Sequence, residues 1–560
     1  MSKKQQPARQ QKQVKPNQKT ESSSDLKKYF PFIITIIFFG LSFIGILNHE
    51  MWRDELQAWL VARDAHSLPG LLHNLKYEGN PMLWHFFLFI ITIFTHNPFW
   101  MQVFHILIST AFVFLLNKYS PFSIFEKILL TFGYFSFFEF NLISRSYGLG
   151  FLLVIIFCIL YKNRYKYYLP IAIVLFLLAN THVFGLIFSI AFSAILFLDY
   201  IQNIRQKKIQ PVALSVLFIC GIIIFSGWIS SAAQIYPSAD NSFPVNYPNA
   251  AHPDFTPRLQ HAVSRILTTY FALPSFNQDH FWNSNVAELQ IFDQSGQILF
   301  DSVKILFFVS LLIYLIFFFY FLRKPLMLLL YSLCTLILVY LYYYTYLTHN
   351  RHCSHLFVIL VATFWISYYH KESKLNNNLL IKLSSIGKKV GKWLFILILI
   401  VSFVGGIGSY MRDLRSPFSA SLELVDYLKD NHLDKEVIVG VPDWGVEAVS
   451  AYFDRQCYYP FRKENGSFSI FDKKRNENTD PMEVFKQLDS LYKSGTKKMI
   501  LVYFFELQSY NAETKSSFSF KEGMITENLH LKFLKSIPAA IVEDERYAIY
   551  LIDGEKKEVK

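Results

Sequence analysis

A short segment of the chain carries more carboxylates than its apolar surroundings would suggest. It reads NHEMWRDELQAWLVARD over residues 48–64, directly after the first long apolar run, and it contains Glu50, Asp54 and Glu55. On a helix the adjacent Asp54 and Glu55 would point about 100° apart, so they are not expected to act as a paired acid and base. One of them can face a cavity and accept a proton, while the other orients a neighbour or binds an ion. A hydrated loop edge is the alternative interpretation.

Arginine, histidine and tyrosine residues gather in three further polar segments. These are 139–147 (EFNLISRSY), the turn at 180–182 and 347–355 (LTHNRHCSH). Guanidinium groups at a membrane face suit a lipid phosphate. Arg53 of the acidic segment joins them as a candidate. The candidates for binding a phosphate or an acceptor are then Arg53, Glu139, Arg145, Tyr147, His182, Arg351 and His352. Anchoring of helix ends is the alternative for Glu139 and Arg145, and a satisfied turn histidine is the alternative at the second segment.

Together these segments would offer one exposed carboxylate centre and at least two arginines. A hydrolytic glycosidase needs two carboxylates, because a sugar alcohol is a poor leaving group and must be protonated. When the sugar is linked to a lipid phosphate, the leaving group is already an acceptable anion. One base that deprotonates the acceptor is then sufficient, with cations or a metal to stabilise the departing phosphate.

Aromatic and polar residues around the acidic segment are candidates for a sugar or lipid groove. They are Trp52, Trp59, Tyr77, Glu78, Asn80 and Trp84. An aromatic belt at the membrane interface is the alternative interpretation of the aromatic members. A divalent ion, magnesium or manganese, would bind at Asp54 if one is used. The histidines of 347–355 fit no common zinc spacing.

The composition of the chain indicates which elements must position these residues. Of 560 residues, 52% are apolar and 18% aromatic, and only 17% are charged, against about 25% in a soluble domain. These values exclude a soluble protein, a disordered chain and a disulfide scaffold. The net charge of +12 comes mostly from short stretches between apolar runs. This placement is typical of a membrane topology signal, so no nucleic-acid partner is expected.

The sequence predicts an α-helical polytopic membrane protein with about eleven transmembrane helices. The apolar runs are 29–47, 99–116, 123–138, 147–161, 168–180, 183–198, 209–229, 301–322, 325–346, 355–370 and 393–410. A twelfth run, 81–95, is predicted to lie at the membrane surface. If it crossed, every later loop would invert and the basic clusters would fall outside, against the positive-inside rule.

The predicted organisation has three parts. Residues 1–28 form a disordered basic cytoplasmic tail. Residues 29–411 form the membrane domain, with a first outer loop at 48–98 and a long outer loop at 230–300. Residues 412–560 form a small α/β domain outside the cytoplasm. In that domain we expect a helix at 419–432, a strand at 436–441, a helix at 446–454, a strand at 498–504 and a hairpin over 539–553 with its turn at 543–545.

The first outer loop resembles a known family. WRDELQAWLVARD, followed by YEGNPMLW, is similar to the corresponding loop of the GT-C superfamily of membrane glycosyltransferases. Within it, the likeness is to the branch of protein O-mannosyltransferases and lipid A aminoarabinose transferases (glycosyltransferase family 39). Those enzymes have an acidic motif just after the first span, followed by surface-lying helices. One of these helices starts at a step with usually two prolines, whereas Asn80-Pro81-Met82 has one.

The resemblance covers about residues 1–200, and the rest of the chain only as architecture. It implies that Asp54 is the catalytic residue, with Glu55 beside it, and that 139–147 is a second functional outer loop. There Glu139, Arg145 and Tyr147 would contact acceptor or phosphate. It also implies polyprenyl-phosphate sugar donors that arrive from the non-cytoplasmic side.

These arguments predict a glycosyltransferase that transfers a sugar from a polyprenyl-phosphate carrier to an acceptor hydroxyl outside the cytoplasm. Asp54 would act as general base, with inversion at the anomeric carbon. The acceptor would be a protein, a glycolipid or a polysaccharide, and the location a bacterial inner or plasma membrane. A transporter or flippase of lipid-linked sugars is one alternative, but its polar residues should lie near the membrane midplane. A membrane scaffold with an outer binding domain is the other alternative.

Overall fold

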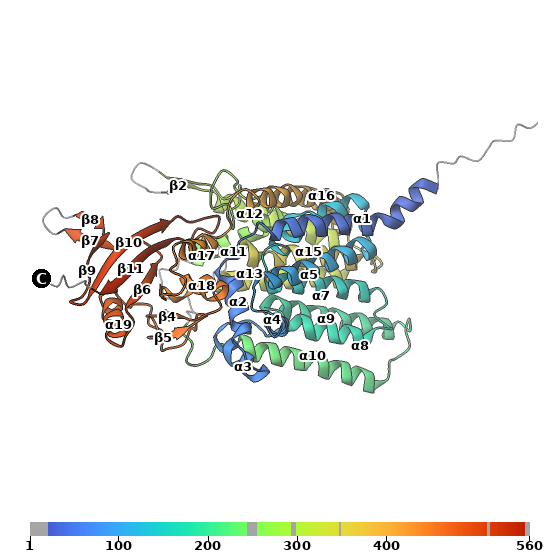
Figure 1. Ribbon diagram of the computed structural model, residues 1–560. Helices are drawn as coiled ribbons and strands as arrows, with labels where there is room; N and C mark the ends of the chain where they lie inside the picture. Colours follow the sequence, from blue (N-terminus) through green and yellow to red (C-terminus); the bar gives the residue numbers. More distant parts are fainter. Residues whose placement is uncertain (1–20, 243–254, 293–297, 346–348, 512–515, 555–560) are drawn as a thin grey trace, which may run out of the picture.

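The computed structural model describes residues 21–242, 255–292, 298–345, 349–511 and 516–554. The chain forms a bundle of helices with a sheet domain at one end, and α1 (Glu21–Ile46) begins at the opposite end (Figure 1). The predicted tail of 1–28 therefore ends earlier than expected, because residues 21–28 already belong to α1. Residues 1–20 of that tail lie outside the described residues.

Seven helices of the described chain are long and apolar enough to cross a membrane. They are α1, α5 (Phe99–Tyr119), α9 (Val183–Arg205), α10 (Leu214–Ile235), α12 (Val303–Phe321), α13 (Pro325–Thr345) and α16 (Asn378–Asp413). On the outer helix α10, Phe218, Phe225 and Ile229 are exposed. Such exposed apolar surface is stable against lipid and costly in water. The chain is a multi-pass membrane protein.

Four of the predicted spans are shorter helices, so seven rather than eleven reach spanning length. They are α6 (Ile124–Thr131) with the π-helical turn η2 (Tyr134–Glu139), α7 (Ser146–Tyr161), α8 (Tyr168–Ala179) and α15 (His355–Ser367). The break between α6 and η2 occurs at Gly133, where the Tyr134 N–H donates to the Ser402 hydroxyl (3.1 Å). A side chain of α16 thus replaces a bond of the helical ladder.

Helix ends meet in two clusters, one at each end of the bundle. Near the sheet domain, Gln102 at the start of α5 donates to the carbonyl of His49 after α1 (3.1 Å). At the other end, the Tyr161 hydroxyl of α7 lies 2.8 Å from the His370 ring after α15. Arg164, after α7, pairs there with Asp199 of α9.

The predicted first outer loop, residues 48–98, folds into α2 (Arg53–Arg63), α3 (Leu68–Asn74), η1 (Leu75–Tyr77) and α4 (Leu83–Thr92). Before α4, the Met82 N–H donates to Gln234 at the end of α10 (2.9 Å), and after it His96 pairs with Asp454 of the sheet domain (2.9 Å). Both flanks of α4 therefore lie at the same end of the bundle. With ten residues, α4 is about 15 Å long, half of what a bilayer core requires.

The long outer loop and the step into α15 carry smaller elements. They are α11 (Phe255–Tyr270), β1 (Gln290–Phe292), β2 (Ile298–Asp301) and α14 (Asn350–Cys353). Parts of the predicted segments 230–300 and 347–355 lie outside the described residues, at 243–254, 293–297 and 347–348.

The C-terminal domain is a seven-stranded mixed sheet in the order β5-β4-β3-β6-β11-β10-β9. Its strands are β3 (Val437–Val441), β4 (Cys457–Tyr459), β5 (Glu464–Gly466), β6 (Lys498–Tyr503), β9 (Glu522–Met524), β10 (Leu529–Ile537) and β11 (Tyr547–Gly554). β3 runs parallel to β4 and β6, with Val439 opposite Tyr458 and Leu501. The remaining elements are α17 (Ser421–Asp430), η3 (Asp443–Val446), α18 (Glu447–Tyr452), α19 (Pro481–Lys493) and a two-stranded ribbon of β7 (Gln508–Asn511) and β8 (Ser516–Ser519).

The predicted helices and strands of this domain are confirmed as α17, β3, α18 and β6. The predicted hairpin is wrong: β11 pairs with β10, with Ile537 opposite Tyr547, so the connection spans 538–546. Within it the Ile541 and Val542 N–H groups donate to the carbonyls of Pro417 (3.2 Å) and Phe418 (2.9 Å). Because these donors are bonded to the segment that follows α16, they do not join a hairpin.

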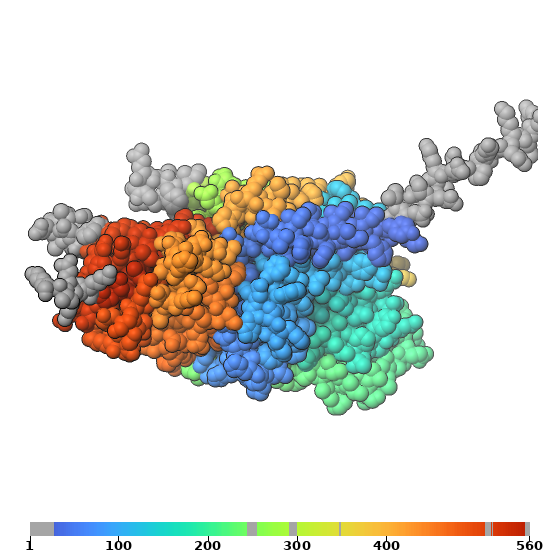
Figure 2. Space-filling model, in the orientation of Figure 1, coloured from blue at the N-terminus to red at the C-terminus, as the bar shows by residue number. Residues whose placement is uncertain are grey.

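Sheet domain and bundle share one apolar core. It continues from the membrane helices to the face of the sheet that carries Ile438, while Val439 and Val441 on the opposite face pack in a second core under α19. This alternation follows the two-residue period of a strand. In the space-filling view the orange sheet domain abuts the blue first outer loop directly (Figure 2).

Candidate functional site

The start of α2 is fixed at the junction of bundle and sheet domain. Trp52 is the N-cap residue, and its N–H donates to Glu55 Oε2 (3.1 Å), which is the glutamate half of a capping box. Asp54 lies in the first turn of α2, where a negative charge is favoured by the helix dipole. The geometry of the acidic motif is therefore set by the helix itself.

Three arginines surround the Asp54 carboxylate. Its Oδ2 lies 2.8 Å from Arg145 Nη1 and 3.7 Å from Arg351 Nη2, and its Oδ1 lies 3.6 Å from Arg53 Nε. Burial alone would raise the pKa of Asp54. The attraction of Arg145, Arg351 and Arg53 outweighs burial and lowers the pKa below its ordinary value. Asp54 is therefore ionised at neutral pH, and the three predicted residues are brought together with it.

Aromatic rings hold Arg351 in place. Its guanidinium lies over the rings of Trp52 (4.9 Å) and Trp282 (5.4 Å), which themselves meet edge to face. Arg351 Nε also donates to His352 Nε2 (3.4 Å). Because the ring faces fix the planar group without using its N–H donors, the donors that His352 and Asp54 do not engage are available to an anion.

Glu55 faces away from Asp54, into a buried polar cluster. Its Oε1 accepts from the Ser144 N–H (2.6 Å), and its Oε2 lies 3.4 Å from His49 Nε2. Burial would lower the pKa of His49, but Asp413 and Glu55 raise it to about 10. The two candidate catalytic residues therefore have different surroundings: Asp54 meets the arginines, and the buried Glu55 orients α2 and the chain before Arg145.

Glu78 is the second carboxyl of the site. Gln57 Nε2 donates to Glu78 Oε1 (2.6 Å), and Gln57 lies on the same face of α2 as Asp54, one turn later. Burial raises the pKa of Glu78 to about 7, with a further rise from Asp54 and opposing effects of Gln57 and Arg145. The site therefore holds one carboxyl that is ionised at neutral pH, Asp54, and one that exchanges its proton near neutral pH, Glu78.

Glu139 closes the side of the site next to the bundle. It is buried, and its Oε2 accepts from the Tyr134 hydroxyl (3.1 Å) and the Trp282 indole N–H (3.2 Å). Since Trp282 also covers Arg351, Glu139 orients a ring that holds the guanidinium. It supports the arginine through Trp282.

The predicted histidines and Tyr147 form an aromatic cluster beside Arg351. The Tyr147 ring lies 5.2 Å from His182 and 6.4 Å from His352. His182 caps α9, because its Nδ1 accepts from the Gly185 N–H (3.0 Å). His182 therefore supports the cluster as a cap, whereas His352 is the histidine next to the arginine.

The predicted groove residues separate into several places. Trp59 and Trp84 are buried in the core, so they line no open groove. The Tyr77 hydroxyl donates to Asp240 (2.7 Å), and the Asn80 amide donates to the Glu78 carbonyl (3.3 Å). Of this group, only Trp52 and Glu78 border the arginine cluster.

The sheet domain holds Arg53. The Arg53 N–H donates to Glu545 Oε1 (2.8 Å), its guanidinium pairs with Asp544, and the group lies 4.2 Å from the ring centre of Trp444. Trp444 belongs to η3, just after β3, where the chain leaves the carboxyl end of a parallel strand. Loops at this edge are the usual binding position of α/β sheets. Here the loop that carries Trp444 contacts Arg53 at the start of α2.

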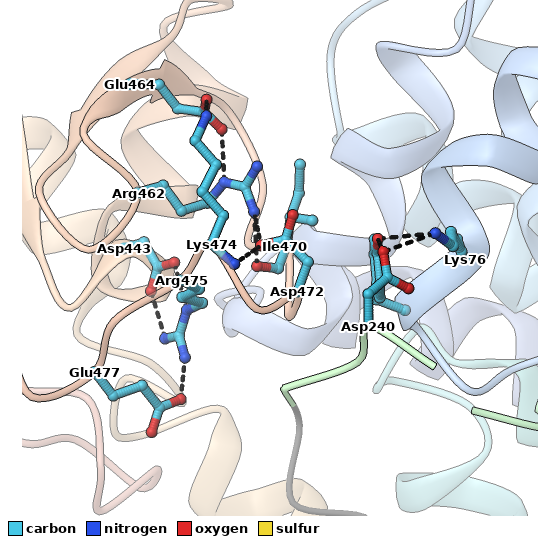
Figure 3. Close-up of polar contacts among 11 residues, drawn as sticks. Lys76, Asp240, Asp443, Arg462, Glu464, Ile470, Asp472, Lys474, Arg475 and Glu477 are labelled. Carbon is cyan, nitrogen blue, oxygen red and sulfur yellow. Dashed lines mark hydrogen bonds and ion pairs between the residues drawn. The ribbon is translucent and has the colours of Figure 1, made fainter. Parts of the chain in front are cut away.

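A second set of contacts joins the predicted outer loops to the sheet domain, in addition to those of Arg53. Lys76 and Tyr77 meet Asp240, and Figure 3 shows the Lys76–Asp240 contact. The Lys473 N–H donates in turn to the Asp240 carbonyl (2.9 Å). The chain after α10 is thereby joined to both the first outer loop and the sheet domain.

A buried ion pair stabilises this part of the domain. Arg475 donates to both oxygens of Asp443, with distances of 2.7 and 2.8 Å, and it also pairs with Glu477 (Figure 3). Asp443 directly precedes Trp444. A bidentate pair of this kind fixes the positions of both side chains and of the segments that carry them. It therefore also fixes Trp444, which covers Arg53.

The donor set at Asp54 does not fit a protein-held divalent ion. Within the described ranges, no three histidine, cysteine or acidic side chains are placed to ligate a metal. Asp54 itself is paired with arginines, and Glu55 is turned away from it. Magnesium and calcium sites need several oxygen donors, and the residues around Asp54 do not supply them.

Several residues of the site could not be found from the sequence motif. Trp282 and Trp444 come from distant segments and carry no local signal. Gln57 was identifiable in principle, since it follows Asp54 by three residues. His49 and Asp413 were hidden because each lies at the end of an apolar run.

The fold and the site together define a multi-pass membrane protein with a cation-rich polar site where the bundle meets its sheet domain. No protein-family model, no curated protein and no solved structure matches the chain.

Proposed function

We propose that this protein is a GT-C-type glycosyltransferase that moves a sugar from a polyprenyl-phosphate donor to an acceptor hydroxyl outside the cytoplasm. The observation that carries the proposal is the convergence of Arg53, Arg145 and Arg351 on Asp54 at one end of an apolar bundle. A lipid-linked phosphate requires cations and an adjacent apolar environment for its chain, and this junction offers both.

The arginine cluster suits the leaving phosphate. Three guanidinium groups face Asp54, and Arg53 also pairs with Asp544, so one positive charge is left over after both carboxylates are paired. Arg53 Nη1 and His352 Nδ1 are buried atoms with no hydrogen-bond partner among the described residues. A phosphate oxygen would satisfy such donors, and preorganised donors are the main way in which enzymes stabilise developing charge.

Asp54 is the proposed base. In the transfer, the acceptor oxygen attacks the anomeric carbon and its proton goes to Asp54. The bond from that carbon to the phosphate oxygen breaks, and its electron pair stays on the phosphate. Attack opposite the leaving group inverts the configuration. A bound phosphate would also draw the guanidinium groups away from Asp54 and make the carboxylate a stronger base. Glu78, whose pKa is about 7, can take the proton onward.

The proposed topology has eleven crossings, with α4 lying at the outer surface. Chain segments alternate between the two ends of the bundle, and four crossings use the shorter segments α6–η2, α7, α8 and α15. The end away from the sheet domain receives basic loops, among them Lys162, Arg164 and Lys166. The positive-inside rule favours that end as the cytoplasmic side of a bacterial plasma membrane. The site and the sheet domain would then face outward.

The direct test is sugar transfer by the purified full-length protein in nanodiscs. Radiolabelled sugars on a synthetic prenyl phosphate serve as donors, and a cell-envelope fraction serves as the source of acceptor. We expect transfer by the wild type and none by Asp54→Asn at unchanged yield. Asp279→Asn is the matched control, because that carboxylate is exposed on the same side and should keep full activity. Near-normal transfer by Asp54→Asn removes Asp54 from the mechanism, and movement of the intact donor across the bilayer without transfer indicates a flippase.

A further inference from the structure

Gln57 has a fully determined set of hydrogen bonds. Its Nε2 donates to Glu78 Oε1 (2.6 Å) and to the Ser469 carbonyl (2.9 Å), while its Oε1 accepts from the Ser469 N–H (3.0 Å). Flipping the amide would place its oxygen against two acceptors, so only one orientation fits. The side chain is nearly buried, at 9% exposure. A buried amide with these bonds is a rigid connector between a first-loop carboxyl and the sheet domain.

The connection continues into the sheet domain. The Ser469 N–H also donates to Glu447 Oε1 (3.1 Å), and Glu447 is 1% exposed at the start of α18, which packs against α2. One chain of polar contacts therefore runs from the first outer loop to the sheet domain through Glu78, Gln57, Ser469 and Glu447. Two of these residues belong to the first outer loop and two to the sheet domain.

Charged groups face Glu78 from several elements. Asp54 on α2 and Arg145 before α7 act on it electrostatically, and Glu447 on α18 interacts with it from the sheet domain. Burial raises the pKa of Glu78 to about 7, and the bond from Gln57 opposes this rise. Removal of the amide donor must therefore make the carboxyl hold its proton more tightly.

We propose that Gln57 is a positioning residue that transmits docking of the sheet domain to Glu78, so that the domain is a working part of the transfer site. The proposal rests on the proposed function for its kinetic consequence, but the connection itself exists in the resting protein. The domain holds Gln57 through Ser469, Gln57 holds Glu78, and Glu78 is available to take the acceptor's proton onward from Asp54.

The kinetic test compares pH profiles of kcat/KM for transfer by the full chain. Ionised Glu78 is needed as a proton acceptor, so activity should fall on the acid side around its pKa. In Gln57→Leu, which has similar size and no donor, the acid limb should move up by about one pH unit, a tenfold loss at low pH. Arg63→Gln is the matched control: Arg63 is on the same helix and bonds to the Ser450 carbonyl (2.8 Å) of the same domain. Its acid limb should stay in place.

A second variant tests the detailed geometry. Gln57 uses only the backbone of Ser469, whose hydroxyl interacts with Glu447 instead. Ser469→Ala keeps both bonds to Gln57, so the acid limb should stay in place. If Gln57→Leu and Arg63→Gln both lower kcat without moving the acid limb, Gln57 is merely structural and the proposal is wrong.

A measurement without turnover separates this proposal from the proposed function. The carboxyl band of Glu78 is titrated in the infrared difference spectrum between the wild type and Glu78→Gln. Its midpoint should lie near 7 and rise in Gln57→Leu. A shifted midpoint in a protein that transfers no sugar supports the connection and rejects the glycosyltransferase. An unshifted midpoint overturns the connection whatever the activity.

Discussion

The imidazole of His49 lies 2.9 Å, through its Nδ1, from Oδ2 of Asp413. His49 follows the first membrane helix and Asp413 ends the last one, so this buried contact joins the two ends of the membrane domain. The other ring nitrogen of His49 faces Glu55 at 3.4 Å. The start of α2, and with it Asp54, is therefore supported by a charge pair between the segment after α1 and the end of α16.

This pair predicts a pH-dependent stability. The pKa of His49 is raised from 6.5 to about 10 in the folded protein. The contribution of protonated His49 to the free energy of unfolding is therefore fully present below pH 6.5. It declines above pH 6.5 and is lost as the pH rises through about 10. Thermal unfolding in detergent should show a Tm that falls between pH 7 and pH 10. Asp413→Asn should destabilise the protein by about 3–5 kcal/mol at pH 7 and flatten this dependence. Asp279→Asn, at an exposed carboxylate, should behave as the wild type.

Arg351→Lys should weaken donor binding although the charge is kept. A lysine ammonium cannot lie flat between Trp52 and Trp282, and it lacks the planar set of donors. We expect KM for the prenyl-phosphate sugar to rise about tenfold, which corresponds to about 1.4 kcal/mol of binding energy. Arg258→Lys is the control, since Arg258 covers the Tyr343 ring outside the site. An equal change in both variants would contradict a specific role for Arg351.

Gly405→Ala should destabilise the bundle. A Cβ atom there would lie 2.1 Å from the carbonyl oxygen of Ala272, and a backbone atom cannot move aside cheaply. The expected loss is about 1–3 kcal/mol, visible as a lower Tm. Gly40→Ala is the opposite case, because nothing lies within 4 Å of its added Cβ in α1. That variant should be neutral or gain up to about 1 kcal/mol. Equal Tm values for the two variants would argue against the close approach.

Cysteine labelling should report the topology with little background. All five native cysteines are buried. Asn478 in the sheet domain and Lys162 at the other end of the bundle are both exposed. A membrane-impermeant maleimide should label Asn478→Cys in intact cells and Lys162→Cys only after lysis. The reverse pattern would invert the proposed orientation.

The sequence by itself determined the class of protein. Scarce charge, long apolar runs and a C-terminal region of alternating helices and strands are local properties, and each follows from the cost of exposing apolar or unpaired groups. It also predicted the acidic motif, because carboxylates beside an apolar run are unusual. Of the eleven expected spans, seven are helices of spanning length, because apolar runs do not reveal where a side chain such as Ser402 interrupts a helix.

Only the tertiary structure decided which acidic residue meets the cations. Asp54 and Glu55 are neighbours in the chain, but the 100° step of a helix sends one to Arg145 and the other to the Ser144 N–H and His49. Contacts over long separations settled the rest, since Gln57 and Ser469 are 412 residues apart. Such contacts depend on how the sheet domain packs on the bundle, and local sequence patterns carry no information about that packing.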